Sequence, residues 1–253
     1  MNASTRKIGA LLHKDFADFF KNPTMLVVSL MPIAFMLLYR FIIGDMSGDQ
    51  GLSPEQVAAA DHEILKFLLG TALCLTIGMA GSMTVIYGIA EEKEKHTLRT
   101  LTLANVSAGQ IVVAKSVLAL AVIAVVGAAS FFAAGGQMEH FGIYMLLGVV
   151  GALPVVLVAL VLGLASRDQA TAGVYGVPVL LLTMVPMMGM SSPEIERIAQ
   201  FTPCGGIYDL MGMAMDSSLN GSDVAMPVAV TLAWIAVGAV LFAMMFKRLT
   251  RDN

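Results

Sequence analysis

The sequence predicts an all-α integral membrane protein with six transmembrane helices, and three observations lead to this fold class. The 253 residues are 57% hydrophobic and only 13% charged, whereas soluble globular proteins carry about 25% charged residues. Six stretches stay apolar over the roughly 20 residues that an α-helix needs to cross a bilayer. Lys and Arg are concentrated in the segments on one side of these stretches, as the positive-inside rule expects.

The whole chain, residues 1–253, is predicted to form a single transmembrane domain. A short helix that begins at Ser53-Pro54 is expected to lead into the second span, because serine is a good cap and proline fits the first helical turn. The fifth span is the shortest, and Pro178 and Pro186 predict a kink in it. The spans are expected at about 24–43, 66–90, 112–135, 142–165, 172–190 and 224–246.

The orientation of the spans follows from their flanking charges. The other side of the membrane holds only Arg40, Lys66 and Arg197, together with eleven acidic residues. This bias predicts that both termini are cytoplasmic and that the acidic loops lie outside. Twelve of the 15 cations fall on the predicted cytoplasmic side: Arg6, Lys7, Lys14, Lys21, Lys93, Lys95, Arg99, Lys115, Arg167, Lys247, Arg248 and Arg251.

Two segments outside the spans have helical patterns. Residues 5–22 are predicted to form an amphipathic interfacial helix that ends at Asn22-Pro23. An anchor on the cytoplasmic surface explains this pattern, and a docking surface for a partner is left open. Residues 191–223 predict two short helices broken at Pro203-Cys204-Gly205-Gly206. A re-entrant or surface-lying outer hairpin of this kind could close the outer mouth of a pathway.

The segment 92–115 combines an acidic-basic run, several leucines, a serine and an aliphatic run that ends in lysine. It resembles the cytoplasmic segment after the second span in the ABC-2 family of ABC-transporter permeases. The family usually has Gly, Glu and Pro where this sequence has His96, Arg99 and Asn105. The matching positions, without a gap over 24 residues, are Glu92, Glu94, Thr97, Leu98, Leu101, Ser107 and Lys115.

The resemblance extends along the chain. The helix before Asn22-Pro23 is similar to the family's connecting helix, and Phe246-Lys247-Arg248 is similar to its closing residues. Pro203, Tyr208 and Leu210 resemble the motif before the sixth span, and we assign them to an outer gate. In the family, the segment after the second span forms a coupling helix that docks into a separate ATPase. The residues expected to couple to the ATPase, facing water or this partner, are Glu92, Lys93, Glu94, Thr97, Leu98, Leu101 and Leu103.

The resemblance implies the permease subunit of an ATP-driven exporter in a prokaryotic cell membrane. Two cytoplasmic ATPase subunits would carry ATP and Mg, and a second copy or a homologous permease would complete the assembly. The cargo would be lipophilic or amphiphilic, such as a drug, an antimicrobial peptide or a lipid-linked molecule. Membrane lipid is an expected partner and nucleic acid is not.

The residues inside the spans argue against other transport classes. Residues 67–90, 116–138, 141–166, 169–193 and 224–246 contain no Asp, Glu, Lys, Arg or His. Ion-coupled carriers need such groups, or broken helices, in the membrane, and a membrane enzyme needs a nucleophile or metal ligands. The sequence also has no Gly-x-x-x-x-Gly-Lys-Ser/Thr phosphate loop. We therefore expect no catalytic residue, metal or cofactor in this chain and place the energy source on a partner.

Methionine is abundant, with 19 residues, and leaves one alternative open. Thioethers that line a path could carry Cu(I), so export of copper or a haem-related compound is the rival cargo. Adaptable apolar packing is the simpler interpretation. Cys74 and Cys204 lack metal-type spacing, and Arg40 is interpreted as snorkelling to the headgroups. The candidates for lining a route between the second and fifth spans are Thr76, Met79, Met83, Met184 and Met188.

Overall fold

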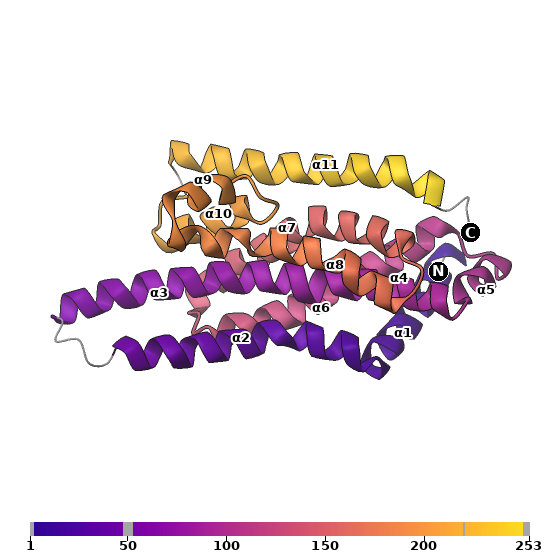
Figure 1. Ribbon diagram of the computed structural model, residues 1–253, viewed down its shortest axis with the longest axis horizontal. Coiled ribbons are helices and arrows are strands. Elements are labelled where there is room, and N and C mark those ends of the chain that lie inside the picture. The colour runs from indigo at the N-terminus through magenta and orange to yellow at the C-terminus, as the bar shows by residue number, and fades with distance from the viewer. Residues whose placement is uncertain (1–2, 48–52, 220, 250–253) are drawn as a thin grey trace.

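A computed structural model describes residues 3–47, 53–219 and 221–249, and all regular secondary structure in these ranges is helical (Figure 1). A π-helical segment, η1 (Thr76–Ser82), joins α3 to α4, and two 3₁₀ segments are η2 (Val185–Ser191) and η3 (Ser222–Val224). The α-helices are α1 (Ala3–Lys21), α2 (Pro23–Ser47), α3 (Pro54–Leu75), α4 (Met83–Glu94), α5 (Thr97–Leu103), α6 (Ala108–Ala133), α7 (Met138–Ala165), α8 (Gln169–Met184), α9 (Pro193–Ala199), α10 (Gly205–Met215) and α11 (Ala225–Leu249).

Six helical stretches in the described part of the chain are long and apolar enough to cross a membrane. The prediction of an all-α membrane protein with six spans is therefore confirmed. The second stretch is longer than the sequence suggested, because the helix that begins at Pro54 continues without a break into the span. The six stretches are Pro23–Ile43, Pro54–Glu94, Ala108–Ala133, Met138–Ala165, Gln169–Gly189 and Ser222–Met245.

The stretch Pro54–Glu94 is the centre of the bundle. It runs through α3, η1 and α4, and all seven residues of η1 are buried. Helices α2, α6, α7 and α8 pack around it, whereas α11 lies against α7 and α10. Its 41 residues correspond to roughly 60 Å of helix. One continuous element therefore connects the two ends of the molecule.

The two ends of the bundle hold different short helices (Figure 1). Helices α1 and α5 lie at one end, together with the last turn of α11, and we call this the α5 end. Helices α9 and α10 lie towards the opposite end, where α2 ends and α3 begins, and we call this the α10 end. The first and last described helices thus meet at the same end, as an even number of spans requires. Arg251, one of the twelve cations on the predicted cytoplasmic side, lies outside the described residues.

Candidate functional site

Helix α1 buries a charged residue within its apolar stripe. Leu11, Asp15 and Phe19 recur at every fourth position, so they share one face of the helix. All three are buried, and Asp15 is only 3% exposed. This face packs mainly against α6 and makes smaller contacts with α2 and α4. The predicted interfacial helix is therefore also part of the protein's core.

The carboxylate of Asp15 belongs to a group of four charged side chains, three of which are buried. Lys115 Nζ donates to Asp15 Oδ1 at 2.8 Å and to Glu92 Oε1 at 3.0 Å. Lys14 Nζ donates to the same Glu92 Oε1 at 2.7 Å. Glu92 and Lys115 are each only 4% exposed. We call Lys14, Asp15, Glu92 and Lys115 the ion cluster, and it joins α1, α4 and α6.

The pKa values of Asp15 and Lys14 depend on the charges around them. Burial raises the pKa of Asp15, and the positive charge of Lys115 offsets this only in part. Burial alone would lower the pKa of Lys14, but its hydrogen bond to Glu92 and the charge of Glu92 hold that pKa above its usual value. Removing one partner of a buried ion pair costs about 3–5 kcal/mol, because the other charge is left uncompensated. The packing of α1 on α4 and α6 therefore depends on the three buried members, Asp15, Glu92 and Lys115.

The charged residues around Glu92 also bind the neighbouring helices. Glu91 accepts a hydrogen bond from Asn22 Nδ2 at 2.8 Å, and Lys93 Nζ donates to the Leu164 carbonyl at 2.7 Å. Glu94 accepts from the backbone N–H of Gln169 at 3.1 Å. The expectation that Glu92 faces water or a partner is therefore wrong. Its carboxylate is drawn inward because Lys115, from α6, needs a counter-charge in the interior.

Helix α5 follows as a short element at the tip of this end. His96 (φ 55°) and Asn105 (φ 59°) flank it in the left-handed conformation, which His and Asn adopt more readily than most residues. Thr97 Oγ1 donates to the Glu92 carbonyl at 3.1 Å, which fixes the start of α5 against α4. Leu101 is half-buried and Leu103 is 81% exposed. The side chain of Leu98 lies outside the part of the chain that the structure describes.

The candidates for lining a route are divided between the interior and the surface. Thr76, Met79 and Met83 lie on η1 and α4 and are buried. Met184 is half-buried against the same core, and Met188 is 52% exposed. The first three therefore pack inside the subunit and present no free surface to a cargo.

The residues assigned to an outer gate lie at the α10 end. Pro203 and Leu210 are buried, and Tyr208 is half-buried. The ring of Tyr208 packs so closely on Gly70 of α3 that a Cβ atom there would lie 2.6 Å from Tyr208 Cε2. Tyr208 thus packs α10 closely against the central helix.

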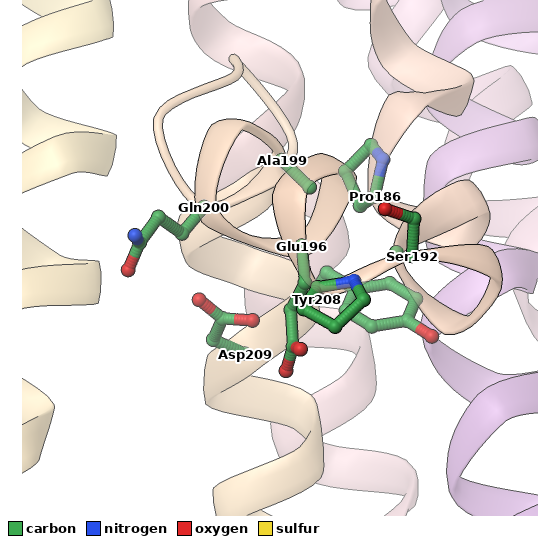
Figure 2. A pocket seen from close by; sticks show the side chains of 9 residues that line it. Pro186, Ser192, Glu196, Ala199, Gln200, Tyr208 and Asp209 are labelled. Carbon is green, nitrogen blue, oxygen red and sulfur yellow. The ribbon is translucent and has the colours of Figure 1, made fainter.

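A pocket of about 290 Å³ lies beside Tyr208, between η2, α9 and α10 (Figure 2). The carboxyl groups of Glu196 and Asp209 lie on the same side of it (Figure 2). Burial, together with the negative charge of Glu196, raises the pKa of Asp209 to about 6. Asp209 therefore changes its protonation state closer to neutral pH than an ordinary aspartate does.

Polar contacts tie α10 to α3 at the same end. Asp216 accepts from Lys66 Nζ at 2.8 Å, and His62 Nε2 lies 3.0 Å from its other oxygen. His62, Glu63 and Asp216 come close enough to suggest a metal site. However, Lys66 already pairs with both carboxylates, so the cluster is balanced by an ammonium group.

Three further residues have clear positions. Arg40 is exposed, lies beside Gly135 and lines a cavity of about 310 Å³ with Asp61. This place at the edge of the α10 end fits the snorkelling interpretation.

Cys74 and Cys204 are both buried, and their thiols interact. Cys204 therefore has a neighbouring thiol, although no sequence pattern pairs it with Cys74.

The architecture is that of a multi-pass membrane protein with a short helix presented beyond one end of the bundle. The profile of the ABC-2 type transporter family matches residues 6–194, from α1 to the start of α9. The chain therefore belongs to the ABC-2 type transporter family. No curated protein matches the chain. The family assignment supports a transport subunit and thereby confirms the resemblance in the sequence.

The residues that sequence reasoning missed are Asp15 and Asn22, and it gave Lys115 no role in the site. Asp15 interrupts an apolar stripe at a position where leucine or phenylalanine would be expected, and this was a usable signal. Its partner could not be found in the same way, because Lys115 is 100 residues away in sequence. Only the packing of α1 on α6 brings the two together.

Proposed function

We propose that this chain is the permease subunit of an ATP-driven exporter and that ATP hydrolysis takes place on two separate cytoplasmic ATPase subunits. A second copy of the chain or a homologous permease would complete the transporter. The observation that carries the proposal is the match to the ABC-2 type transporter family over residues 6–194. Helix α5, a short helix at the tip of one end whose Leu103 is 81% exposed, is the element that we assign to ATPase docking.

The central helix connects the proposed docking helix α5 to the rest of the bundle. A push on α5 would reach α4 through Thr97 and Glu92, and α4 continues through η1 into α3. The ion cluster would carry the same displacement to α1 and α6. Because α10 is wedged on α3 at Gly70, the movement would reach the far end as well.

The cargo that fits is lipophilic or amphiphilic, because the interiors of the spans, residues 67–90, 116–138, 141–166, 169–193 and 224–246, contain no charged residue that could bind an ion. Thr76, Met79 and Met83 are buried in the subunit, so we place the route at its boundary with the second permease. Helix α8 exposes apolar side chains such as Val177 and Leu181 and would contribute to this boundary. Met188 is exposed on the following segment and is retained as a lining residue.

The docking role of α5 can be tested by truncating its leucines. The double variant L101A/L103A should reach normal abundance, because truncating partly exposed side chains opens no large cavity. It should lose co-purification of a co-expressed Walker-motif ATPase, and export with it. The matched control is L146A/L153A, which truncates two exposed leucines on α7. Binding and export by the α5 variant at the level of the parent would contradict the proposal.

The α5 end is proposed to be cytoplasmic, with both termini there. In a variant without Cys74 and Cys204, a single cysteine at position 107 or 253 should react only with reagents on the cytoplasmic side. A single cysteine at position 218 should react only from outside. Labelling of position 107 from outside in sealed cells would reverse the orientation.

A further inference from the structure

Helices α3 and α10 meet along a single face of each, and the facing residues recur at every fourth position. Residues four apart lie on the same side of a helix. Each step of four residues forward along α3 is matched by a step of four residues back along α10, so the two helices run antiparallel. From the α10 end inward, the facing pairs are His62 with Asp216, Lys66 with Gly212, Gly70 with Tyr208, and Cys74 with Cys204.

The two middle pairs show how closely the helices approach each other. A Cβ atom on Gly212 would lie 3.3 Å from Lys66 Cε. A Cβ atom on Gly70 would lie 2.6 Å from Tyr208 Cε2, nearer than a Cβ atom can approach. A glycine in each pair therefore holds the backbones of α3 and α10 close together on the line that leads to the cysteine pair.

The fourth pair consists of the only two cysteines in the sequence, Cys74 and Cys204. Cys74 is the penultimate residue of α3, and Cys204 directly precedes α10. Both are 0% exposed, and their thiols interact. A disulfide needs two β-carbons about 3.5–4.5 Å apart whose side chains point towards each other. Facing positions on closely packed helices provide this arrangement.

We propose that Cys74 and Cys204 are a disulfide site, and that oxidation from the outer side of the membrane joins α10 covalently to the central helix. The inference rests on the proposed function, which places the α10 end outside the cytoplasm, where disulfides form and persist. It adds a covalent restraint on the segment assigned to the outer gate, since Tyr208 follows Cys204 by one helical turn.

The oxidant is a small disulfide in the outer compartment, such as cystine or oxidised glutathione. Cys204 belongs to the outer segment and meets this oxidant first. Its thiolate attacks the small disulfide, forms a mixed disulfide and releases one small thiol. When α10 docks on α3, the thiolate of Cys74 attacks the Cys204 sulfur and releases the second small thiol. Two protons and two electrons thus pass from the two cysteines to the small disulfide.

Burial decides when this reaction occurs. With 0% exposure, neither thiol can meet an oxidant in the folded protein. The first step therefore takes place before α10 has docked on α3, while the chain is still folding in the membrane. Once α10 has packed, the same burial shields the bond from reducing agents, so the bond should persist until the protein unfolds.

Counting free thiols in the denatured chain tests the proposal. Membranes from aerobically grown cells are quenched with acid, dissolved in SDS and treated with a maleimide mass tag before and after reduction. The parent should take up no tag before reduction and two tags after it, since the chain has two cysteines. It should run as a monomer on a non-reducing gel. Two tags before reduction, or a reducible dimer, would overturn the proposal.

The matched control moves one cysteine off the shared face. C74A/T76C keeps two cysteines at buried positions, but residue 76 faces α6, where a Cβ atom on Gly127 would lie 3.6 Å from Thr76 Cγ2. This variant should take up two tags without reduction. Failure to tag it before reduction would show that the bond does not depend on the register of α3 and α10, and would overturn the proposal.

Labelling of position 218 separates a failure of this inference from a failure of the proposed function. In C74A/C204A/S218C, the new cysteine should react from outside if the proposed orientation holds. Free thiols in the parent, together with labelling of position 218 from outside, overturn the inference and leave the proposed function standing. Free thiols together with labelling only from the cytoplasm contradict both.

Thermal unfolding measures what the bond does. Parent protein expressed with a membrane-permeant reductant should unfold about 5 °C or more below parent protein expressed without it, because the bond closes a long loop. The same treatment should leave the unfolding temperature of C74A/C204A unchanged. Equal unfolding temperatures for the two parent samples would show that no bond restrains α10 and would overturn the proposal.

Discussion

The two ends of the bundle are held together by different kinds of interaction. At the α5 end, Asp15, Glu92 and Lys115 join three helices through buried charges 2.8 to 3.0 Å apart. At the α10 end, partly exposed ion pairs such as Lys66 with Asp216 add to close helix contacts at glycines that leave no room for a side chain. A Cβ on Gly206 would lie 2.3 Å from the Pro227 carbonyl oxygen. The first end is sensitive to the removal of charge and the second to the addition of volume.

This difference matches the work proposed for each end. Buried charges can exchange one partner for another, provided that a new counter-charge arrives, so they suit an end that binds a second protein. Close packing between glycines and rigid backbone allows little change and transmits displacement. The α10 end would therefore move with the central helix as a unit, whereas the α5 end would respond to what binds it.

The largest effect is expected when the ion cluster is broken by charge reversal. E92K places a third cation beside Lys14 and Lys115 and leaves Asp15 as the cluster's one carboxylate. Destabilisation should reach about 3–5 kcal/mol, seen as a large loss of folded protein in membranes and of thermal stability in detergent. E94K is the control, because Glu94 is exposed. Comparable stability of E92K and E94K would show that Glu92 is not buried in an ion cluster.

A smaller effect is expected from one added methyl group at the α10 end. G206A should destabilise the protein by about 1–3 kcal/mol. The new Cβ would lie 2.3 Å from the Pro227 carbonyl oxygen and 2.5 Å from Thr231 Oγ1, and neither group can move away freely. G142A is the matched control, since no atom would lie within 4 Å of its Cβ. Helix propensity predicts a slight gain there. Thermal unfolding of the purified variants measures both, and equal stability would contradict the close packing.

The smallest effect is a dependence on pH at the α10 end. The folded pKa of Asp209 is about 6, above the ordinary value of about 3.9. The folded state therefore binds the proton more tightly, and the contribution of Asp209 to stability falls as pH rises from about 4 to about 6. D209N should remove this component from the pH profile of thermal unfolding. An unchanged profile in D209N would mean that Asp209 titrates normally.

Composition and hydropathy were sufficient to predict the fold, but they could not predict which charged residues are buried. The six spans follow from apolar length alone, and the second was underestimated only because residues 54–65 are too polar to count as membrane-spanning. Glu92 was assigned to the surface because charged residues are rarely buried without a partner. Its partners come from α1 and α6, and no local pattern reveals that pairing. The left-handed conformation of His96 could be predicted, since the family usually has glycine at this position.

Measuring what energises transport tests the whole account most directly. Proteoliposomes holding the purified chain alone are compared with proteoliposomes that also hold a co-expressed Walker-motif ATPase, using fluorescent amphiphilic dyes as probes. The account predicts no ATP hydrolysis and no dye movement with the chain alone, even under an imposed proton gradient. Both should appear with the ATPase and Mg·ATP, and both should be lost in L101A/L103A. Dye movement driven by the proton gradient through the chain alone would contradict the account.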